Sequence, residues 1–325
     1  LAIPTYIAAY TYAGIFDYTG PIQVFMRQTL EMQPEPGWFN IMNFRGLVVI
    51  MALVLYPYVY AIARSAFLSQ SRNILESSRV LGSSATRTFF KIALPVNRPA
   101  IVGGLMLVVM EVLNDYGAVK YFGVSTFTTG IFRAWFSLGD SSAAAYLSSM
   151  LMGFVFALIL LERWQRGRAR YDPGARMSRP LRLYRLSRFR KFLAFVVCSI
   201  PFLFGFGIPV LQLLSWAYQT AAEVVDPAFW TMVANSFLLA VGASLLCVMV
   251  ATLLLYAVRV NRNRTLQNVS KSAVLGYSIP GAVIAVGVMV PLLFLDKQVI
   301  GKITTFLGGE VNLILTSSVF ALLYA

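Results

Sequence analysis

Few residues in this sequence could do chemistry, and the most conspicuous are two acids inside an apolar run. Glu111 and Asp115 stand four residues apart, about one helical turn, in a stretch apolar enough to cross a membrane. A charge at the bilayer centre costs about 2.5 to 3.5 kcal/mol, so such acids usually face a polar cavity or a partner. The sequence predicts that both line a translocation path. The alternative is a span that ends near Leu113, with Asp115 at the outer interface and Glu111 paired with a basic or hydroxyl group.

The usual residues of an active site are missing. Histidine is absent, so no imidazole can act as a base, a proton relay or a metal ligand. Cys198 and Cys247 stand singly in apolar segments, without the spacing of a zinc site or a disulfide framework. No GxxxxGK[ST] phosphate loop occurs, so ATP hydrolysis is not expected of this chain. We therefore predict a protein that is not an enzyme, with no catalytic residue, metal site or cofactor of its own.

The composition is that of an integral membrane protein. Of 325 residues, 58% are hydrophobic and only 12% are charged, and the mean hydropathy is +0.71. The apolar residues come in blocks of about 20, the length that a helix needs to cross a bilayer, and not in the shorter alternating segments of a β-barrel. The sequence predicts an all-α, polytopic transmembrane helical bundle. Its spans are expected near residues 1–16, 46–68, 99–118, 141–161, 192–218, 230–257, 272–294 and 311–325.

The basic residues predict the orientation of the spans. Most of the 27 lysines and arginines fall in loops 64–98, 162–191 and 259–271, whereas acids such as Asp17 and Asp296 fall on the other side. The positive-inside rule therefore places these loops in the cytoplasm of a multi-pass protein of the bacterial inner (cell) membrane. A net charge of +14 could also indicate nucleic-acid binding. Attraction to the anionic leaflet explains the basic loops better, so the expected partner is the lipid bilayer and not nucleic acid.

A parallel internal repeat organises the chain. The stretch from Ile3-Pro4 to Asp17 is echoed from Ile279-Pro280 to Asp296, and YPYVYA at 56–61 resembles FALLYA at 320–325. Because six predicted spans separate the copies, both cross in the same direction, which weighs against an inverted-repeat secondary transporter. We predict two parallel halves, 1–161 and 192–325, joined by a basic cytoplasmic linker at 162–191. Both halves are expected to be truncated, because the chain begins and stops inside apolar runs.

The loop at residues 74–95 is too polar to span a membrane. Gly82 permits a turn between two short helices, and Pro95 can set the entry into the next span. Its apolar and basic residues form an amphipathic pattern, which would also suit a helix resting on lipid. The fixed positions of the loop are Glu76, Ser77, Ser78, Gly82, Ile92, Leu94 and Pro95.

This pattern resembles the EAA loop of permease subunits of bacterial ABC importers, with Ser77-Ser78 in place of two alanines. The resemblance implies a type I ABC importer permease fold, in which these loop residues form a coupling helix that docks on a separate cytoplasmic ABC ATPase dimer. ATP would be bound by that partner, and a periplasmic substrate-binding protein would deliver the solute. A second such loop is expected about fifteen residues beyond Ala325, by analogy with the distance from Ala61 to Glu76.

Residues 2–4, 17–21, 114–123 and 126–131 are similar to ferric-iron-type permeases, which fuse two permease halves in one chain. This likeness implies import of iron(III). Thiamine or another small solute is the alternative within the same class, and a secondary transporter is the alternative from another class. Tyr6 and Tyr10 share a helix face, and their oxygens could bind iron(III). Packing or anchoring at the membrane interface is the simpler interpretation of these tyrosines.

Overall fold

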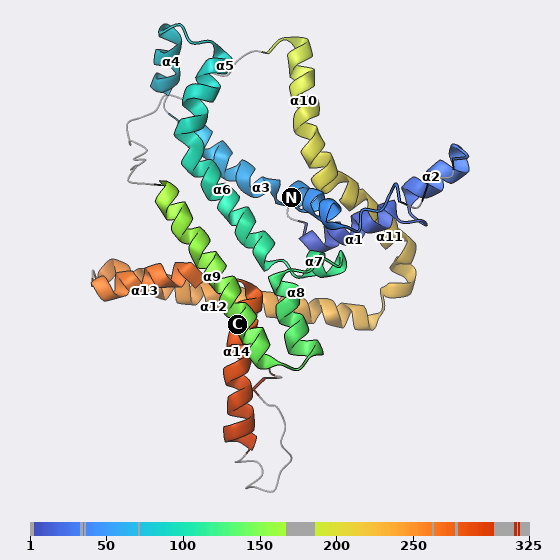
Figure 1. Ribbon diagram of the computed structural model, residues 1–325, viewed down its shortest axis with the longest axis vertical. Helices are drawn as coiled ribbons and strands as arrows, with labels where there is room; N and C mark the ends of the chain where they lie inside the picture. Colours follow the sequence, from blue (N-terminus) through green and yellow to red (C-terminus); the bar gives the residue numbers. More distant parts are fainter. Residues whose placement is uncertain are drawn as a thin grey trace. The chain divides into compact units, whose positions relative to one another are not determined.

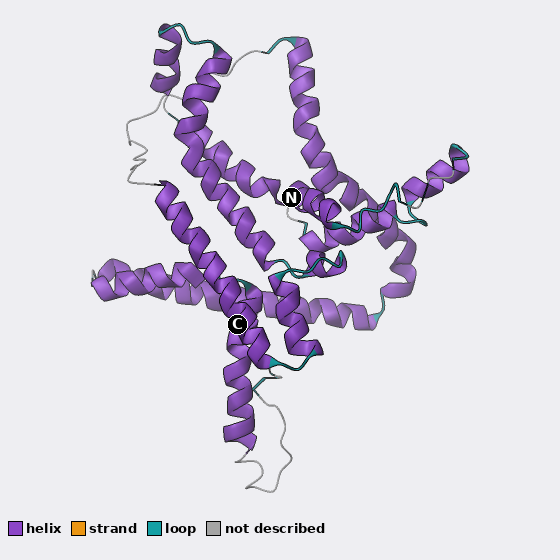
Figure 2. Cartoon of the chain, in the orientation of Figure 1, coloured by secondary structure: helices purple, strands orange, loops and turns teal. Residues whose placement is uncertain are grey.

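The described part of the chain is helical throughout. The computed structural model describes residues 3–32, 35, 37–70, 72–166, 186–261, 263–276, 279–301, 315–316 and 318. Every regular element among them is a helix, as Figure 2 shows, so the all-α fold class is confirmed. Most of the predicted linker 162–191 and most of the predicted last span 311–325 lie outside the described residues.

Six helices within these ranges are long and apolar enough to cross a membrane. They are Phe44–Ser69, Ala85–Asn114, Ser141–Glu162, Arg188–Val224, Pro227–Val260 and Gly281–Ile300. Each of the predicted spans 46–68, 141–161, 192–218 and 230–257 falls inside one of these helices. The described part of the first predicted span, 1–16, holds only the 12-residue helix α1 (Thr5–Phe16).

Two predicted spans are displaced. The span predicted at 99–118 ends at Asn114, because Asp115 takes an extended backbone and its carboxylate caps the next helix. The span predicted at 272–294 begins instead at Gly281, since residues 264–275 form a separate amphipathic helix and Pro280 starts the new one. That helix continues to Ile300, so Asp296 lies within it and not in a loop.

The chain folds into two compact units, drawn with their helix labels in Figure 1. Unit 1 comprises residues 1–126 and 156–213, and unit 2 comprises residues 127–155 and 214–325. Unit 1 holds α1, α2 (Pro21–Thr29), α3 (Phe44–Ser69), α4 (Arg72–Val80), α5 (Ala85–Thr88), η1 (Phe89–Ala93), α6 (Leu94–Asn114), α7 (Gly117–Tyr121), α10 (Arg188–Phe202) and η3 (Leu203–Gly207). Unit 2 holds α8 (Phe127–Phe132), η2 (Arg133–Ser137), α12 (Pro227–Val260), α13 (Arg264–Leu275), α14 (Gly281–Phe294) and η5 (Leu295–Ile300). The helices α9 (Ser141–Arg166) and α11 (Ile208–Val224) have residues in both units.

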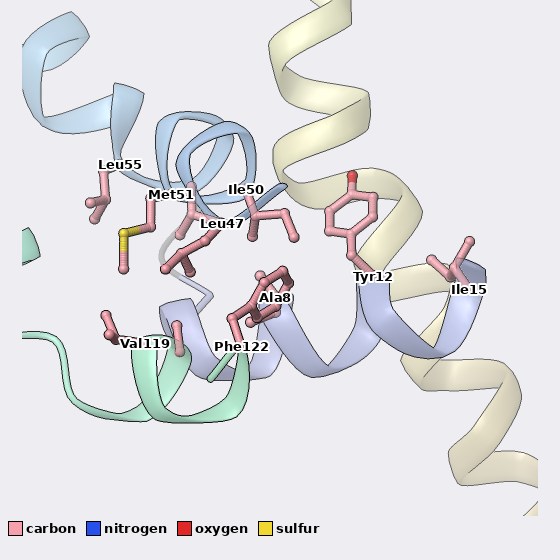
Figure 3. Close-up of a cluster of buried hydrophobic side chains, with 12 residues drawn as sticks. Ala8, Tyr12, Ile15, Leu47, Ile50, Met51, Leu55, Val119 and Phe122 are labelled. Atoms are coloured by element: carbon pink, nitrogen blue, oxygen red, sulfur yellow. The ribbon is translucent and has the colours of Figure 1, made fainter. Parts of the chain in front are cut away.

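The core of unit 1 forms where α3 packs along α6 and against α1, and where α1 packs against α7. Gly104 of α6 permits the close approach, because a Cβ there would lie 2.9 Å from the Cα of Val59. Figure 3 shows the buried cluster at the α1–α3–α7 junction. Its members are Ala8, Ala9, Tyr12, Ile15, Leu47, Ile50, Met51, Val54, Leu55, Ala118, Val119 and Phe122.

The π-helical turn η3 joins this core through two backbone contacts. The Tyr12 hydroxyl points out of the cluster, as Figure 3 shows, and it donates a hydrogen bond to the Phe204 carbonyl. Gly205 lies directly on α3, because a Cβ at this position would come within 2.1 Å of the Leu53 carbonyl oxygen. The helix that opens the predicted second half is thus fastened to spans of the predicted first half.

Among the described residues of unit 2, Asp296 is a buried acid. Asp296 is fully buried, and its carboxylate accepts hydrogen bonds from the backbone N–H groups of Leu315 and Thr316 at 2.9 and 2.8 Å, and from the Thr316 hydroxyl at 2.5 Å. These donors compensate for the loss of water around the carboxylate. Elsewhere in the unit, Ile131 of α8 and Leu151 of α9 are buried, and the rings of Phe127 and Phe154 join these two helices with centroids 5.5 Å apart.

The two copies of the predicted repeat start their helices in the same way. Pro4 precedes α1 with φ −54° and ψ 137°, and Pro280 precedes α14 with φ −59° and ψ 137°. Each proline carbonyl accepts from the N–H group four residues later. The copies then differ, because α1 ends before an exposed Asp17 whereas α14 runs on through the buried Asp296.

Replacing Gly205 by alanine is expected to destabilise unit 1. The new methyl group would collide with the backbone of α3, which cannot move aside as a flexible side chain would. Overpacking of this kind costs about 1 to 3 kcal/mol, so the temperature of unfolding in detergent should fall. Gly153→Ala is the matched control, because its Cβ would meet nothing within 4 Å. Equal unfolding temperatures for the two variants would contradict the proposed close contact.

Candidate functional site

The loop between α3 and α6 folds as two short helices and a turn. Helix α4 ends at Val80, and α5 begins at Ala85 after Ser84, whose hydroxyl accepts from the N–H of Arg87 at 3.3 Å. The chain then passes through η1 into α6 without a break. Figure 1 shows α4 and α5 at one end of α6, with α7 at its other end.

The turn depends on Gly82, as predicted. Its φ of +81° lies in the left-handed region that residues with a Cβ rarely adopt. The N–H of Gly82 donates to the Arg79 carbonyl at 2.9 Å, and the N–H of Ser83 donates to the Ser78 carbonyl at 3.1 Å. This pair of bonds is a Schellman motif, which ends α4 and satisfies its last carbonyls.

The structure places the predicted loop residues on two sides of this element. Glu76 and Ser77 are exposed on α4, and the neighbouring Val80 and Leu81 are 88% and 85% exposed. Ser78 is buried. The element therefore has an exposed tip, made of residues 76, 77 and 79–82, that carries both a carboxylate and apolar side chains.

Pro95 is the second residue of α6, at the entry into the span. It does not begin a separate helix, because one continuous helix runs from Ala85 to Asn114. The π-helical turn η1 ends two residues before Pro95, and η3 ends two residues before Pro209 in the same way. Proline has no N–H and clashes with the carbonyl four residues earlier, so a wider turn at this place accommodates it. Ile92 and Leu94, on either side of the junction, are half-buried.

Sequence reasoning missed the partners of the buried loop residues. The hydroxyls of Ser78 and Thr88 lie 2.7 Å apart. Asn97, in the first turn of α6, donates to Gln70 at the end of α3 at 3.0 Å. All four side chains are buried. The sequence shows only that small hydroxyl or amide side chains stand near a span. Such a pattern does not reveal that Ser78 pairs with a residue ten positions away, or Gln70 with one 27 positions away.

Glu111 and Asp115 do not share a helix face, because α6 ends at Asn114. The carboxylate of Asp115 accepts from the Thr5 hydroxyl and from the N–H groups of Ala118 and Val119 at 2.9 and 3.4 Å, so it ties α1 to the start of α7. The early end of the span corresponds to the alternative considered above. Both side chains are half-buried, and a role for them in a translocation path stays a prediction.

The tyrosines near this junction are engaged with one another. Tyr6 and Tyr10 are each about half exposed, and the Tyr10 ring meets the edge of Tyr121 with 5.8 Å between centroids. Burial, with Tyr10 and Asp17 nearby, raises the pKa of Tyr121, which keeps its phenol protonated at neutral pH and makes it a weaker metal ligand. The described residues contain no group of three or more His, Cys, Asp or Glu side chains that could hold a metal ion.

Comparison with known families identifies the class of protein. Residues 1–170, more than half of the chain, match the model of the family described as binding-protein-dependent transport system inner membrane component. The chain belongs to this family. Membership agrees with the multi-pass membrane helices and with the resemblance of the loop between α3 and α6 to an EAA loop.

Relatives within the family differ in their named solute. The chain is 29% identical over 257 residues to the Fe(3+)-transport system permease protein FbpB 2 of Haemophilus influenzae, covering 77% of this chain and 50% of that protein. It is 28% identical over 136 residues to the molybdenum transport system permease protein ModB of Escherichia coli, covering 39% and 59% of the two chains. It is 27% identical over 129 residues to the molybdate/tungstate transport system permease protein WtpB of Pyrococcus abyssi, covering 39% and 52%. The chain therefore spans about half the length of these curated relatives. No solved structure matches it significantly.

Replacing Gly82 by alanine is expected to loosen the turn between α4 and α5. A left-handed backbone costs a residue with a Cβ about 1 to 2 kcal/mol more than glycine. Amide hydrogen exchange at residues 80–84 should therefore become faster. Gly276→Ala is the control, because Gly276 has a right-handed φ of −55° and open space around its Cβ position. Unchanged exchange in the Gly82 variant would contradict the Schellman geometry.

Proposed function

We propose that this chain is the membrane-spanning part of an ATP-driven importer, with the loop of α4 and α5 as its docking element for a separate cytoplasmic ABC ATPase dimer. The exposed tip carries this proposal. It offers Glu76 beside the apolar Val80 and Leu81, at the end of two packed spans, on the side that the basic loops assign to the cytoplasm. ATP is bound by the partner, since this sequence holds no phosphate loop of its own.

Mechanical coupling follows from the position of the loop. The ATPase subunits close when they bind ATP, and a helix docked on them is carried along. Because α4 and α5 lie at the joined ends of α3 and α6, their displacement tilts both spans together. The two halves of the importer thereby alternate between outward and inward access. A periplasmic binding protein presents the solute on the outer side.

Iron(III) is the proposed solute. The relative named for Fe(3+) transport aligns with 77% of this chain, whereas the molybdenum and molybdate/tungstate relatives align with 39% each. The resemblance of residues 2–4, 17–21, 114–123 and 126–131 to ferric-iron-type permeases points the same way. Molybdate and thiamine are the solutes against which this proposal is tested.

Uptake into proteoliposomes tests the function directly. The full-length parent chain, its ATPase and a periplasmic binding protein loaded with radioactive iron(III) should accumulate iron only when ATP is supplied. Glu76→Lys should abolish co-purification of the ATPase, because it reverses a charge at the docking surface. Glu223→Lys, on an exposed site at the end of α11, is the matched control and should leave uptake unchanged. ATP-independent uptake would refute the importer, and uptake of molybdate or thiamine instead of iron would refute the solute alone.

We further propose that Glu111 and Asp115 border the translocation path at the outer end of α6. Glu111 lies in the last turn of α6 and Asp115 directly after it, and both are half-buried where an uncompensated carboxylate is costly. A site for a trivalent cation would need such oxygen donors close to the mouth of the path. The hydrogen bonds of Asp115 to Thr5 and to α7 fix the position of its carboxylate.

Two substitutions separate the charge of Asp115 from its capping role. Asp115→Asn keeps an oxygen that can accept from the N–H of Ala118, so we expect a nearly unchanged unfolding temperature. Because it removes the negative charge, we expect the uptake rate to fall about tenfold or more. Asp115→Leu removes the cap as well and should also cost about 0.5 to 2 kcal/mol of stability. Wild-type uptake by Asp115→Asn combined with Glu111→Gln would exclude both carboxylates from the path.

A further inference from the structure

Two buried side-chain pairs hold the loop against the spans, the first of them at its base. The amide nitrogen of Asn97 donates to Gln70 Oε1 at 3.0 Å and to the Ala93 carbonyl at 2.8 Å, which uses both of its hydrogens. Gln70 is 7% exposed and Asn97 is 6% exposed. Gln70 follows the last residue of α3 and Asn97 lies in the first turn of α6, so the pair closes the loop where it leaves the spans.

The second pair lies further out, across the turn at Gly82. The hydroxyls of Ser78 and Thr88 are 2.7 Å apart, and the two residues are 4% and 5% exposed. Their bond joins α4 to α5, and α5 continues through η1 into α6. The stacked rings of Phe67 and Phe89, with centroids 6.0 Å apart, add an apolar contact between α3 and η1.

The two pairs lie between the exposed tip and the spans that must move. The Ser78–Thr88 bond joins α4 to α5 in addition to the turn at residues 81–84. Without the Gln70–Asn97 bond, the ends of α3 and α6 could separate under load. The resembled motif has alanine in place of Ser78, so this hydroxyl pair is a feature of this chain and not of the motif.

We propose that the pairs Gln70–Asn97 and Ser78–Thr88, here called the loop latches, are positioning residues that make α4, α5 and η1 move with α3 and α6 as one body. A pull on the tip then reaches both spans at once. With a latch open, the docked ATPase still turns over, but part of its motion is lost in the loop and less solute is moved per ATP. This inference rests on the proposed docking function.

A single and a double substitution in the reconstituted full-length complex test the outer latch. Thr88→Val leaves the Ser78 hydroxyl buried without its partner, which should lower the unfolding temperature. Ser78→Ala combined with Thr88→Val removes both hydroxyls and should restore it. The number of solute molecules moved per ATP should fall in both variants, because the loss of one hydrogen bond shifts the equilibrium of the latch about fivefold toward its open form. Thr88→Ser keeps the hydroxyl and should behave like the wild type.

A merely structural role predicts a different pattern, in which solute moved per ATP recovers together with stability. A wild-type ratio in the doubly substituted protein would therefore overturn the proposal for the outer latch. Gln70→Leu tests the base latch in the same assay and should lower the ratio, while Gln219→Leu, an exposed glutamine on α11, should not. An unchanged ratio in Gln70→Leu would overturn the base latch.

Measuring the affinity of each variant for the ATPase distinguishes a failure of the latch proposal from a failure of the docking proposal. The latch variants should bind the ATPase within about twofold of the wild type, because their side chains are buried and do not form the tip. Failure of the wild-type chain to bind any ATPase would refute the proposed function itself. Lower solute transport per ATP with normal ATPase binding would support the latches.

Discussion

The close packing of α3 against α6 is the contact on which the rest of unit 1 depends. It requires the absence of a side chain at Gly104, which lets the backbones of the two helices touch near Val59. Within a bilayer, helices gain nothing from leaving water, so close van der Waals contact has to hold them together. Because both helices are long, this one contact fixes the loop of α4 and α5 at one end and the junction with α1 and α7 at the other.

Three polar side chains at the ends of spans each have a structural task. Asp115 caps α7 and holds Thr5, Asp296 binds the backbone at residues 315 and 316, and Asn97 joins two helix ends. A membrane offers no water to such groups, so each must find its donors or acceptors within the protein. The same bonds that satisfy them also determine where helices stop and how loops are held.

Features set by local chemistry could be predicted from the sequence. Hydropathy located four of the six spans well, and a single glycine at position 82 indicated the turn between two short helices. The pattern from Glu76 to Pro95 led to the family that the comparison identifies. The sequence placed the end of this span too far along the chain, because the hydropathy gives no signal that the helix stops at Asn114. The helix stops there because the carboxylate of Asp115 caps the next helix, α7. The partners of Ser78 and Asn97 depend on tertiary contacts, which no local pattern encodes.

The π-helical turn before Pro95 also decides which side of α6 meets α3. A π turn contains one residue more than an α-helical turn, and each residue rotates the helix by about 100°. The residues of α6 therefore lie about 100° away from the positions that an uninterrupted α-helix starting at Ala85 would give them. Deletion of one residue within Phe89–Ala93 would turn Gly104 away from α3 and bring a bulkier neighbour into the contact.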